Sequence, residues 1–361
     1  MLIIDGHEDI AYNALEWKRD IRLSVHEVRK REGHTSSGEG AGGIAMSGLP
    51  ELRRGGFGVV FGTIFVEPAF IFPDGVPAGL TQVYTTPEEA YRIGQQQLTY
   101  YHELAKEPGI SLILTQEQFQ SFLTSWEASS ADDPQRPFGI IPLMEGADPI
   151  RTPDEVEEWF QRGVRILGLA WRGTRYSGGT GMPGPLTDAG KALLKEMQRV
   201  GMILDISHLA EESFWQALDL FSGPLLASHS NCRVFTPTDR QISDEMIRAL
   251  IERDAVIGIL PGNMFLRGGW SRANRFPIHL DEVVRHIDHV CQLAGDTRHV
   301  AIGTDIDGGF GRDETPEELD TVADIIKIAD ALRAAGYKEE DIANVMHGNW
   351  QRLLTRSLPV A

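Results

Sequence analysis

Five short apolar runs in this chain each end in a residue that can bind a metal ion. The runs read LIIDGHED, IIPLMEG, MILDISH, PLLASHS and VAIGTDIDG, and they lie far apart along the 361 residues. The metal-binding residues that they supply are His7, Asp9, Glu145, His208, His229 and Asp305. Only the fold can bring such distant side chains together. A (β/α)₈ barrel does so, because its active-site residues come from the C-terminal ends of several parallel strands.

Eight apolar runs in all fit strands, and helical patterns separate them. The first is the run LIIDGHED, and the others cover residues 58–66, 139–144, 164–169, 202–206, 224–228, 255–260 and 300–303. Alternating strands and helices are typical of βαβ units in a parallel sheet. Eight repeats favour closure, so we predict an α/β fold, a (β/α)₈ TIM barrel of the metallo-dependent hydrolase type.

The helical patterns also have clear boundaries. Helices are expected at residues 46–54 and 87–107, and the start signals at Thr152 and Ser243 precede two more. The chain from residue 315 onward reads as entirely helical, which adds extra C-terminal helices to the barrel. The glycine-rich stretch 33–43 reads as a surface loop. No linker or internal repeat divides the chain, so we expect one domain over residues 1–361.

Composition excludes several classes of partner. No segment has 18 consecutive apolar residues, which argues against a membrane span. A formal net charge of −18 argues against nucleic acid, whose binding depends on clustered Lys and Arg. The first strand begins at the N-terminus, with no signal-peptide pattern before it, and the two cysteines, Cys232 and Cys291, fit a reducing compartment. We therefore expect a cytoplasmic protein.

The candidate ligands suit a pair of metal ions. Side chains at i and i+2 of a strand point the same way, so His7 and Asp9 can bind one metal while Glu8 points away. Glu145 can bridge two cations, and imidazoles such as those of His208 and His229 suit zinc better than magnesium or calcium. Three carboxylates and three histidines exceed the needs of one four-coordinate zinc. Two metals sharing a water fit them better.

Two ambiguities remain at the level of spacing. Asp305 can be a ligand or a proton shuttle, and Asp307 follows it on the same face of the strand. His286, His289 and Cys291 have the residue types of a second metal site, but they fall on a predicted helix after the seventh strand. We interpret these three as packed or solvated helix residues.

With these residues assembled, the chain resembles the renal (membrane) dipeptidase family, the M19 metallopeptidases. The resemblance rests on an ordered set of motifs: DGHED, MEGAD, LDISH, ASHSNCR, GTDIDG and HGNWQRLL. It implies a barrel with two Zn²⁺ ions per chain and a hydroxide that bridges them. One zinc would be held by His7 and Asp9 and the other by His208 and His229, with Glu145 bridging. Asp305 matches the family's acid/base residue.

The resemblance also implies a substrate and its contacts. The family cleaves small dipeptides and often tolerates a D-residue at the C-terminal position. Its substrate-carboxylate arginine matches Arg240, in DRQISDE. Family members are often dimers, which makes a homodimer an expectation here, although the sequence shows no interface of its own.

One departure from the family pattern concerns the fourth strand. Where the family has a histidine that contacts the substrate carbonyl oxygen, this chain reads GLAWRGTRYSGG and places Trp171. Trp171 can donate one N–H but cannot carry charge, so either Arg172 or Arg175 replaces the histidine or the preferred substrate differs. Loss of one oxyanion donor costs about 10²–10³ in turnover.

Three functions therefore compete. The leading prediction is a zinc-dependent dipeptidase. The first alternative is a binuclear-metal amidohydrolase, such as an N-acyl amino acid deacylase, which Trp171 keeps open. The second is a non-enzymatic binding protein on a degenerate barrel, and the presence of all six metal-site residues argues against it.

Overall fold

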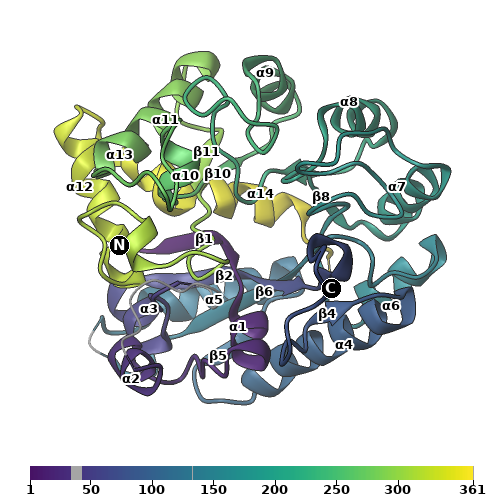
Figure 1. Ribbon diagram of the computed structural model, residues 1–361. Coiled ribbons are helices and arrows are strands. Elements are labelled where there is room, and N and C mark those ends of the chain that lie inside the picture. The colour runs from purple at the N-terminus through teal and green to yellow at the C-terminus, as the bar shows by residue number, and fades with distance from the viewer. Residues whose placement is uncertain (34–42, 132, 361) are drawn as a thin grey trace.

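The structure, a computed structural model, describes residues 1–33, 43–131 and 133–360. Eight parallel strands form a nearly closed barrel surrounded by helices (Figure 1). The barrel strands are β1 (Ile3–Glu8), β2 (Phe57–Phe65), β6 (Phe138–Glu145), β7 (Ile166–Gly168), β8 (Ile203–Asp205), β9 (Leu225–Leu226), β10 (Ile257–Ile259) and β11 (Val300–Ile302). Each overlaps one of the eight predicted runs. The predicted barrel is confirmed.

The order of the strands places β10 and β9 at the two ends of the hydrogen-bonded series. A parallel bridge between Ala227 and Ile257 joins these ends. The amide of Gly258 donates to the carbonyl of Ala227 at 2.8 Å. By contrast, β2 and β6 pair continuously from Val59 and Gly139 to Phe65 and Glu145. The pairing that closes the barrel between β9 and β10 is therefore short.

Three further strands lie outside the barrel. β5 (Ile110–Leu112) pairs with the start of β6, from Ile110 opposite Phe138, along the edge that β7 pairs with further on. β3 (Glu67–Pro68) and β4 (Val83–Tyr84) form a small parallel pair within the long connection after β2. The sequence patterns did not predict these short elements.

The helices surround the barrel, as Figure 1 shows. They are α1 (Ile10–Glu16), α2 (Val25–Arg31), α3 (Leu49–Gly55), α4 (Pro87–Leu104), α5 (Gln116–Ala128), α6 (Val156–Gln161), α7 (Asp188–Val200), α8 (Glu211–Leu220), α9 (Asp244–Glu252), α10 (Asn263–Leu266), α11 (Leu280–Ala294), α12 (Lys327–Ala334), α13 (Glu339–Ala343) and α14 (Asn349–Ser357). The start signal at Ser243 acts as expected, because its side chain accepts from the amide of Met246 and caps α9. Thr152 precedes the 3₁₀-helix Pro153–Glu155, but its side chain makes no capping bond. Among the described residues, no helix is long and apolar enough to cross a membrane.

The C-terminal region differs in part from the prediction. Residues 315–321 form no helix, and Val322–Ile326 is a 3₁₀-helix before α12 begins. Hydrogen bonds to other segments explain the difference, because the amide of Glu317 donates to the carbonyl of Ile278 and Arg29 pairs with Asp320. The predicted loop 33–43 falls mostly on residues 34–42, which lie outside the described residues.

The last helix closes the interior of the barrel. Trp350 and Leu353 of α14 belong to the same buried cluster as Ile4, Phe61 and Leu143 from the strands. The indole of Trp350 donates to the carbonyl of Ile302 at 2.8 Å. Since α14 fills this end of the barrel, the site is expected at the opposite end, where the C-terminal ends of the strands lie.

Candidate metal centre and active site

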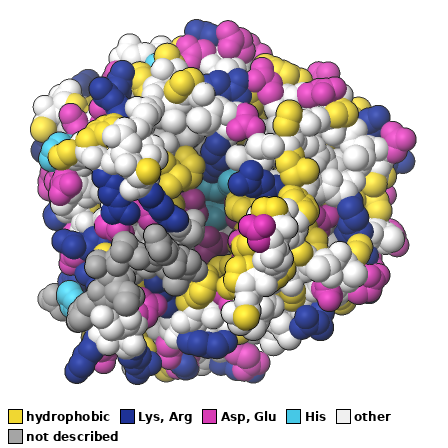
Figure 2. Space-filling view, viewed as in Figure 1, with side chains coloured by type: hydrophobic (Ala, Val, Ile, Leu, Met, Phe, Trp, Pro, Cys, Tyr) yellow, Lys and Arg dark blue, Asp and Glu magenta, His cyan; other side chains and the backbone are white. Residues whose placement is uncertain are grey.

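The six predicted metal-site residues meet at the C-terminal ends of the barrel strands. The imidazole Nε2 of His7 lies 3.8 Å from Asp9 Oδ1, 3.8 Å from Glu145 Oε2 and 3.7 Å from Asp305 Oδ1. Glu145 Oε1 lies 3.1 Å from Nε2 of His208 and 3.3 Å from Nε2 of His229. Figure 2 shows this part of the molecule as a hollow, with histidines visible at depth and basic side chains at its rim.

The donor atoms form overlapping groups. His7, Asp9 and Glu145 make one group in which all ligand atoms lie within 4.8 Å of one another, and Glu145, His208 and His229 make another. A third group contains His7, His229 and Asp305. Glu145 faces both of the first two groups, with Oε2 toward His7 and Oε1 toward the other histidines. The carboxylate is placed where a bridging ligand would be.

Buried polar atoms without partners test whether these residues fit metal ions. His7 Nε2 and Asp9 Oδ1 are both buried and have no hydrogen-bond partner among the described residues. A buried polar group without a partner is costly to the fold. A lone pair on imidazole and a carboxylate oxygen are both ligands for a divalent cation. The residues present therefore fit a metal centre.

The pKa shifts of the metal-free site agree with this chemistry. Burial raises the pKa of Asp9 to about 7. Burial, followed by repulsion from Asp9 and Asp305, raises the pKa of Glu145 well above its ordinary value. Burial lowers the pKa of His7 to about 3, and those of His208 and His229 also fall well below normal. Neutral imidazoles offer lone pairs, and crowded carboxylates gain from a nearby cation.

Backbone strain marks the same place. His208 has φ 64°, Asp305 has φ 53° and Asp307 has φ 63°. A left-handed conformation is uncommon for residues other than glycine, and such strain collects at functional sites. Each of these residues lies three to five positions after the end of a barrel strand, where the chain turns at the mouth of the barrel.

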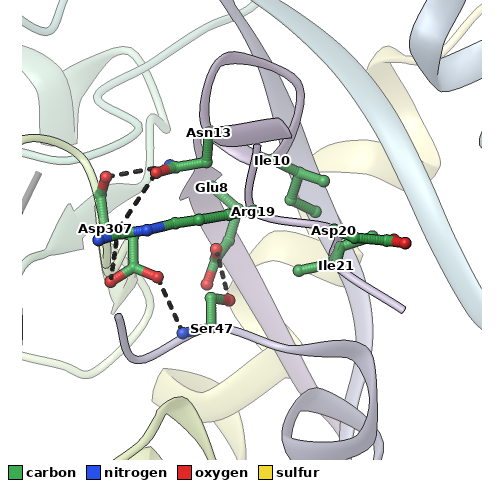
Figure 3. Close-up of a pocket in the computed structure, with 8 residues that line it drawn as sticks. All are labelled: Glu8, Ile10, Asn13, Arg19, Asp20, Ile21, Ser47 and Asp307. Atoms are coloured by element: carbon green, nitrogen blue, oxygen red, sulfur yellow. Dashed lines mark hydrogen bonds and ion pairs between the residues drawn. The ribbon is translucent and has the colours of Figure 1, made fainter. Parts of the chain in front are cut away.

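The structure separates Asp305 from Asp307. Asp305 faces His7, whereas the Asp307 carboxylate accepts hydrogen bonds from the amides of Met46 at 2.9 Å and Ser47 at 3.0 Å. Figure 3 shows Asp307 facing Arg19 and Ser47 in a neighbouring pocket. Asp307 anchors the chain before α3 and does not join the groups of potential metal ligands.

Glu8 points away from His7 and Asp9, as its place in the strand predicts. The Ser47 hydroxyl donates to the Glu8 carboxylate at 3.0 Å, a contact visible in Figure 3. Burial and repulsion from Asp5 and Asp307 raise the pKa of Glu8 well above normal.

Arg240 reaches the same hollow from the chain after β9. The side chain is only 6% exposed, and Nη2 donates to the carbonyl of His229 at 2.6 Å. Nε and Nη1 are buried without a partner among the described residues. The nearby carboxylates of Asp305 and Glu145 partly offset the effect of burial, which lowers the arginine's pKa.

The two arginines after β7 have different surroundings. Arg175 is fully engaged: it pairs with Asp148 at 3.1 Å and donates to the carbonyls of Arg151 and Ile150. Arg172 has its guanidinium 5.4 Å from the centre of the Trp171 ring. In the described part of the chain it forms no ion pair, and its charge helps to lower the pKa of His208.

Trp171 lies close to the histidines. Its ring packs edge-on against Phe65 with centroids 5.0 Å apart, and its centroid lies 6.3 Å from that of His208. The indole therefore forms one wall of the hollow.

His286, His289 and Cys291 lie on α11, outside the groups of potential ligands. The Nδ1 of His286 accepts from the amide of Cys232 at 3.0 Å, and its other nitrogen lies 3.0 Å from the carbonyl of Leu266. The ring is satisfied by the backbone, which supports the interpretation of these residues as packing.

Comparison with known proteins identifies the family of this chain. A family model described as "Membrane dipeptidase (Peptidase family M19)" matches residues 1–358. The chain belongs to peptidase family M19. The members of this family are metallo-dipeptidases, so the protein hydrolyses peptide bonds and depends on metal ions.

Relatives of this M19 dipeptidase occur in bacteria and fungi. A Klebsiella pneumoniae protein, "Uncharacterized protein in pqqA 5'region", is 34% identical over 55% of this chain and 74% of its own length. An uncharacterized dipeptidase of Schizosaccharomyces pombe is 28% identical over 97% of this chain and 80% of its own. A metallo peptidase from Rhodobacter sphaeroides, liganded with a phosphinate mimic of L-Ala-D-Ala, has a TM-score of 0.76 and 25% identity, with 99% of each chain covered.

Sequence reasoning missed the residues behind the ligands of this M19 dipeptidase. Thr180 Oγ1 lies 2.9 Å from Nδ1 of His208. Asp205 and Ser228 lie behind His229, and Asp5 accepts from the hydroxyl of Thr304 at 2.6 Å. Asp205, Ser228, Thr304 and Asp5 lie in LDISH, ASHS, GTD and DGHED, close to a predicted ligand, and this is the signal that could have identified them. Thr180 lies in no such motif.

Proposed function

We propose that this M19 dipeptidase uses two zinc ions to hydrolyse small dipeptides, including those with a D-residue at the C-terminal position. The observation that carries the proposal is the position of Glu145, whose two oxygens face two separate groups of buried nitrogen and oxygen ligands. Binuclear hydrolytic centres place their metals about 3.5–4 Å apart around such shared ligands.

Two residues would hold each ion besides Glu145. His7 and Asp9 would hold one, and His208 and His229 the other. Imidazole with carboxylate is a ligand set that zinc favours. When bound, the ions would polarise the substrate carbonyl and lower the pKa of a shared water toward neutrality.

Asp305 is the residue that we assign to proton transfer. Its carboxylate lies beside His7 at 3.7 Å, inside the hollow, and burial raises its pKa well above normal. A carboxylate with a raised pKa can accept a proton near neutral pH and give it up to the leaving amine. Asp305 would take the proton from the attacking water and pass it to the nitrogen of the cleaved bond.

Arg240 is assigned to the C-terminal carboxylate of the substrate. A buried guanidinium with two unused donors needs an anionic partner, and a carboxylate matches it in shape and charge. The substrate would thus be held between Arg240 and the metal centre, with its scissile carbonyl toward Glu145.

Arg172 is assigned to the position that Trp171 leaves without a cation. Since every polar group of Arg175 that the structure describes is engaged with Asp148 and backbone carbonyls, Arg172 is the better placed of the two to donate toward the carbonyl oxygen. Trp171 would serve as the wall against which the substrate packs.

Support for the D-residue comes from the Rhodobacter sphaeroides peptidase, whose ligand mimics L-Ala-D-Ala. Trp171 favours one second candidate, a deacylase of N-acyl amino acids. Such an enzyme also needs an arginine for the carboxylate but has no need of a free amino terminus. A homodimer, a cytoplasmic location and a single domain over residues 1–361 stay predictions from the sequence.

A panel of L,L- and L,D-dipeptides, each with its N-acetylated counterpart, tests the proposal on protein of measured zinc content. Cleavage of the free dipeptides alone, at two zinc ions per chain and lost in Asp305→Asn, is the expected result. Cleavage of the acetylated compounds alone would replace dipeptidase by deacylase, and full activity at one zinc ion per chain would overturn the binuclear centre.

A further inference from the structure

A single buried serine lies behind two of the proposed metal ligands. The hydroxyl of Ser228 is 2.7 Å from Nδ1 of His229 and 3.4 Å from Nδ1 of His7. The two rings lie side by side with their centroids 3.8 Å apart, and their Nε2 atoms face the carboxylates of the site. One oxygen thus contacts an imidazole from β1 and another from the chain after β9.

Behind the serine lies a buried carboxylate. The Ser228 hydroxyl donates to Asp205 Oδ2 at 2.5 Å. The other oxygen of Asp205, Oδ1, accepts from the amides of Ser207 at 3.0 Å and Ser228 at 2.9 Å. Asp205 is 2% exposed, and the described residues give it donors on both oxygens. An ionised carboxylate can only accept hydrogen bonds, which fits all three contacts.

The number of protons then decides which group donates in each hydrogen bond between His229, Ser228 and Asp205. A hydroxyl has one proton and two lone pairs, and the proton of Ser228 goes to Asp205. Ser228 Oγ can therefore only accept from His229, so Nδ1 of His229 carries the proton. The hydroxyl of Ser207 lies 3.3 Å from Ser228 Oγ and can donate to Asp205. The remaining lone pair of Ser228 can then accept in the same way from His7. Both rings are left with an unprotonated Nε2, the form that binds a metal ion.

We propose that Asp205 and Ser228 form a positioning pair that sets the Nδ1-protonated tautomer of His229 and His7, and so prepares one ligand in each half of the metal centre. The inference rests on the proposed metal centre and is independent of which dipeptide is cleaved. His208 lies outside this pair because Thr180 contacts its Nδ1.

Close packing of the backbone holds Ser228 in place. A β-carbon on Gly258 would lie 2.0 Å from the carbonyl oxygen of Ser228, and one on Gly303 would lie 1.8 Å from it. Only glycine permits such an approach, so β10 and β11 close tightly on this residue. The backbone of Ser228 is therefore fixed beside the two histidines.

The exchange Asp205→Asn reverses the chain of bonds. Two amides donate to Oδ1, so the carbonyl oxygen of the asparagine must take that place and its NH₂ group must face Ser228. The serine would then accept from the amide and donate to Nδ1 of His229. This forces the proton onto Nε2, where it blocks the metal. Asparagine is nearly isosteric with aspartate, yet we expect Asp205→Asn to weaken zinc binding more than Ser228→Ala does.

The test compares Ser228→Ala, Asp205→Asn and a matched control, Ser230→Ala. Ser230 is buried like Ser228 and two residues away, but among the described residues its hydroxyl contacts only the hydroxyl of Ser207, at 3.4 Å. Zinc affinity is measured by chelator competition, without substrate. The tautomer is read in the metal-free proteins from the ¹⁵N shifts of the imidazoles.

Ser230→Ala should bind zinc like the parent protein and Ser228→Ala about 10–100-fold more weakly, as for other groups that orient metal-bound histidines. Asp205→Asn should bind more weakly still and show His229 protonated on Nε2. Equal affinity of Ser228→Ala and Ser230→Ala, or an Nε2-protonated His229 in the parent protein, would overturn the proposal. If Asp205→Asn does not fold, the comparison of Ser228→Ala with Ser230→Ala and the ¹⁵N spectrum of the parent protein still test the proposal. A parent protein that binds zinc but cleaves no dipeptide would count against the proposed function alone.

Discussion

Replacement of Arg240 by methionine is the most direct test of substrate recognition. In the free enzyme this guanidinium is buried and makes one hydrogen bond, from Nη2 to the carbonyl of His229. With a substrate bound, Nε and Nη1 would both donate to the carboxylate. Charge-assisted hydrogen bonds contribute about 1.5–3 kcal/mol each, so about 3–6 kcal/mol is at stake. At about 1.36 kcal/mol for each factor of ten, kcat/KM should fall about 10²–10⁴-fold.

The same change should not weaken the fold. Among the described residues Arg240 forms no ion pair within 4.0 Å, although the carboxylates of Asp305 and Glu145 are near. Its removal relieves the desolvation cost of a buried charge, and an apolar side chain of similar size is then neutral or stabilising. We expect the Tm of Arg240→Met to equal or exceed that of the parent enzyme. A matched control is Arg248→Met, which removes an exposed arginine from α9.

The assay is a cycle of two enzymes and two substrates. Parent and Arg240→Met enzymes are each given a dipeptide and its C-terminal amide, which lacks the carboxylate. The parent should lose most of its activity on the amide, while the variant should treat both compounds alike. If Arg240→Met lowers activity on the dipeptide and on the amide by the same factor, the assignment is refuted. Arg240 would then support the active site in general and would not bind the substrate carboxylate.

Three other changes test separate parts of the site. Thr180→Val should weaken only one of two zinc equivalents, about 10-fold or more in a two-site titration, because Thr180 contacts His208 alone among the ligands; equal weakening of both would contradict this. Trp171→His should raise kcat for ordinary dipeptides, by up to about 10²–10³, and an unchanged kcat would show that the ring does not replace an oxyanion donor. The metal-free protein should lose Tm as the pH rises from about 7 to 8, because histidines of the unfolded chain are then mostly neutral, whereas the buried carboxyls of Asp9, Glu145 and Asp305, whose pKa values are raised, still hold protons that the unfolded chain has lost; added zinc should remove this slope, and a Tm that rises over the same interval would contradict the prediction.

Much of the site could be predicted because it follows strand ends. His7, Glu145 and His229 each come directly after or at the end of an apolar run, and parallel strands end at the same side of a barrel. The choice between Asp305 and Asp307 could not be made from spacing. It depends on the amides of Met46 and Ser47, which come from a distant part of the chain.

Other features depend on contacts that no local pattern records. The role of Ser228 needs Asp205 and two histidines around one oxygen, which only the closed barrel provides. Residues 315–321 carry helical composition, but their backbone and side chains bond to Arg29 and to the carbonyl of Ile278 instead. In both cases tertiary hydrogen bonds decide what the local sequence leaves open.

The short closure beside β9 has a consequence for how the enzyme holds together. The bridge from Ala227 to Ile257 and three backbone hydrogen bonds around it join β9 to β10 and form the seam of the barrel. Ser228 and His229 follow Ala227 directly. His229 faces Glu145, which lies at the end of β6 across the mouth. A metal ion held by His229 and Glu145 would link the seam to β6, which is paired continuously with β2. Loss of metal and opening of the seam would then be a single event, and amide exchange at Gly258 would report both.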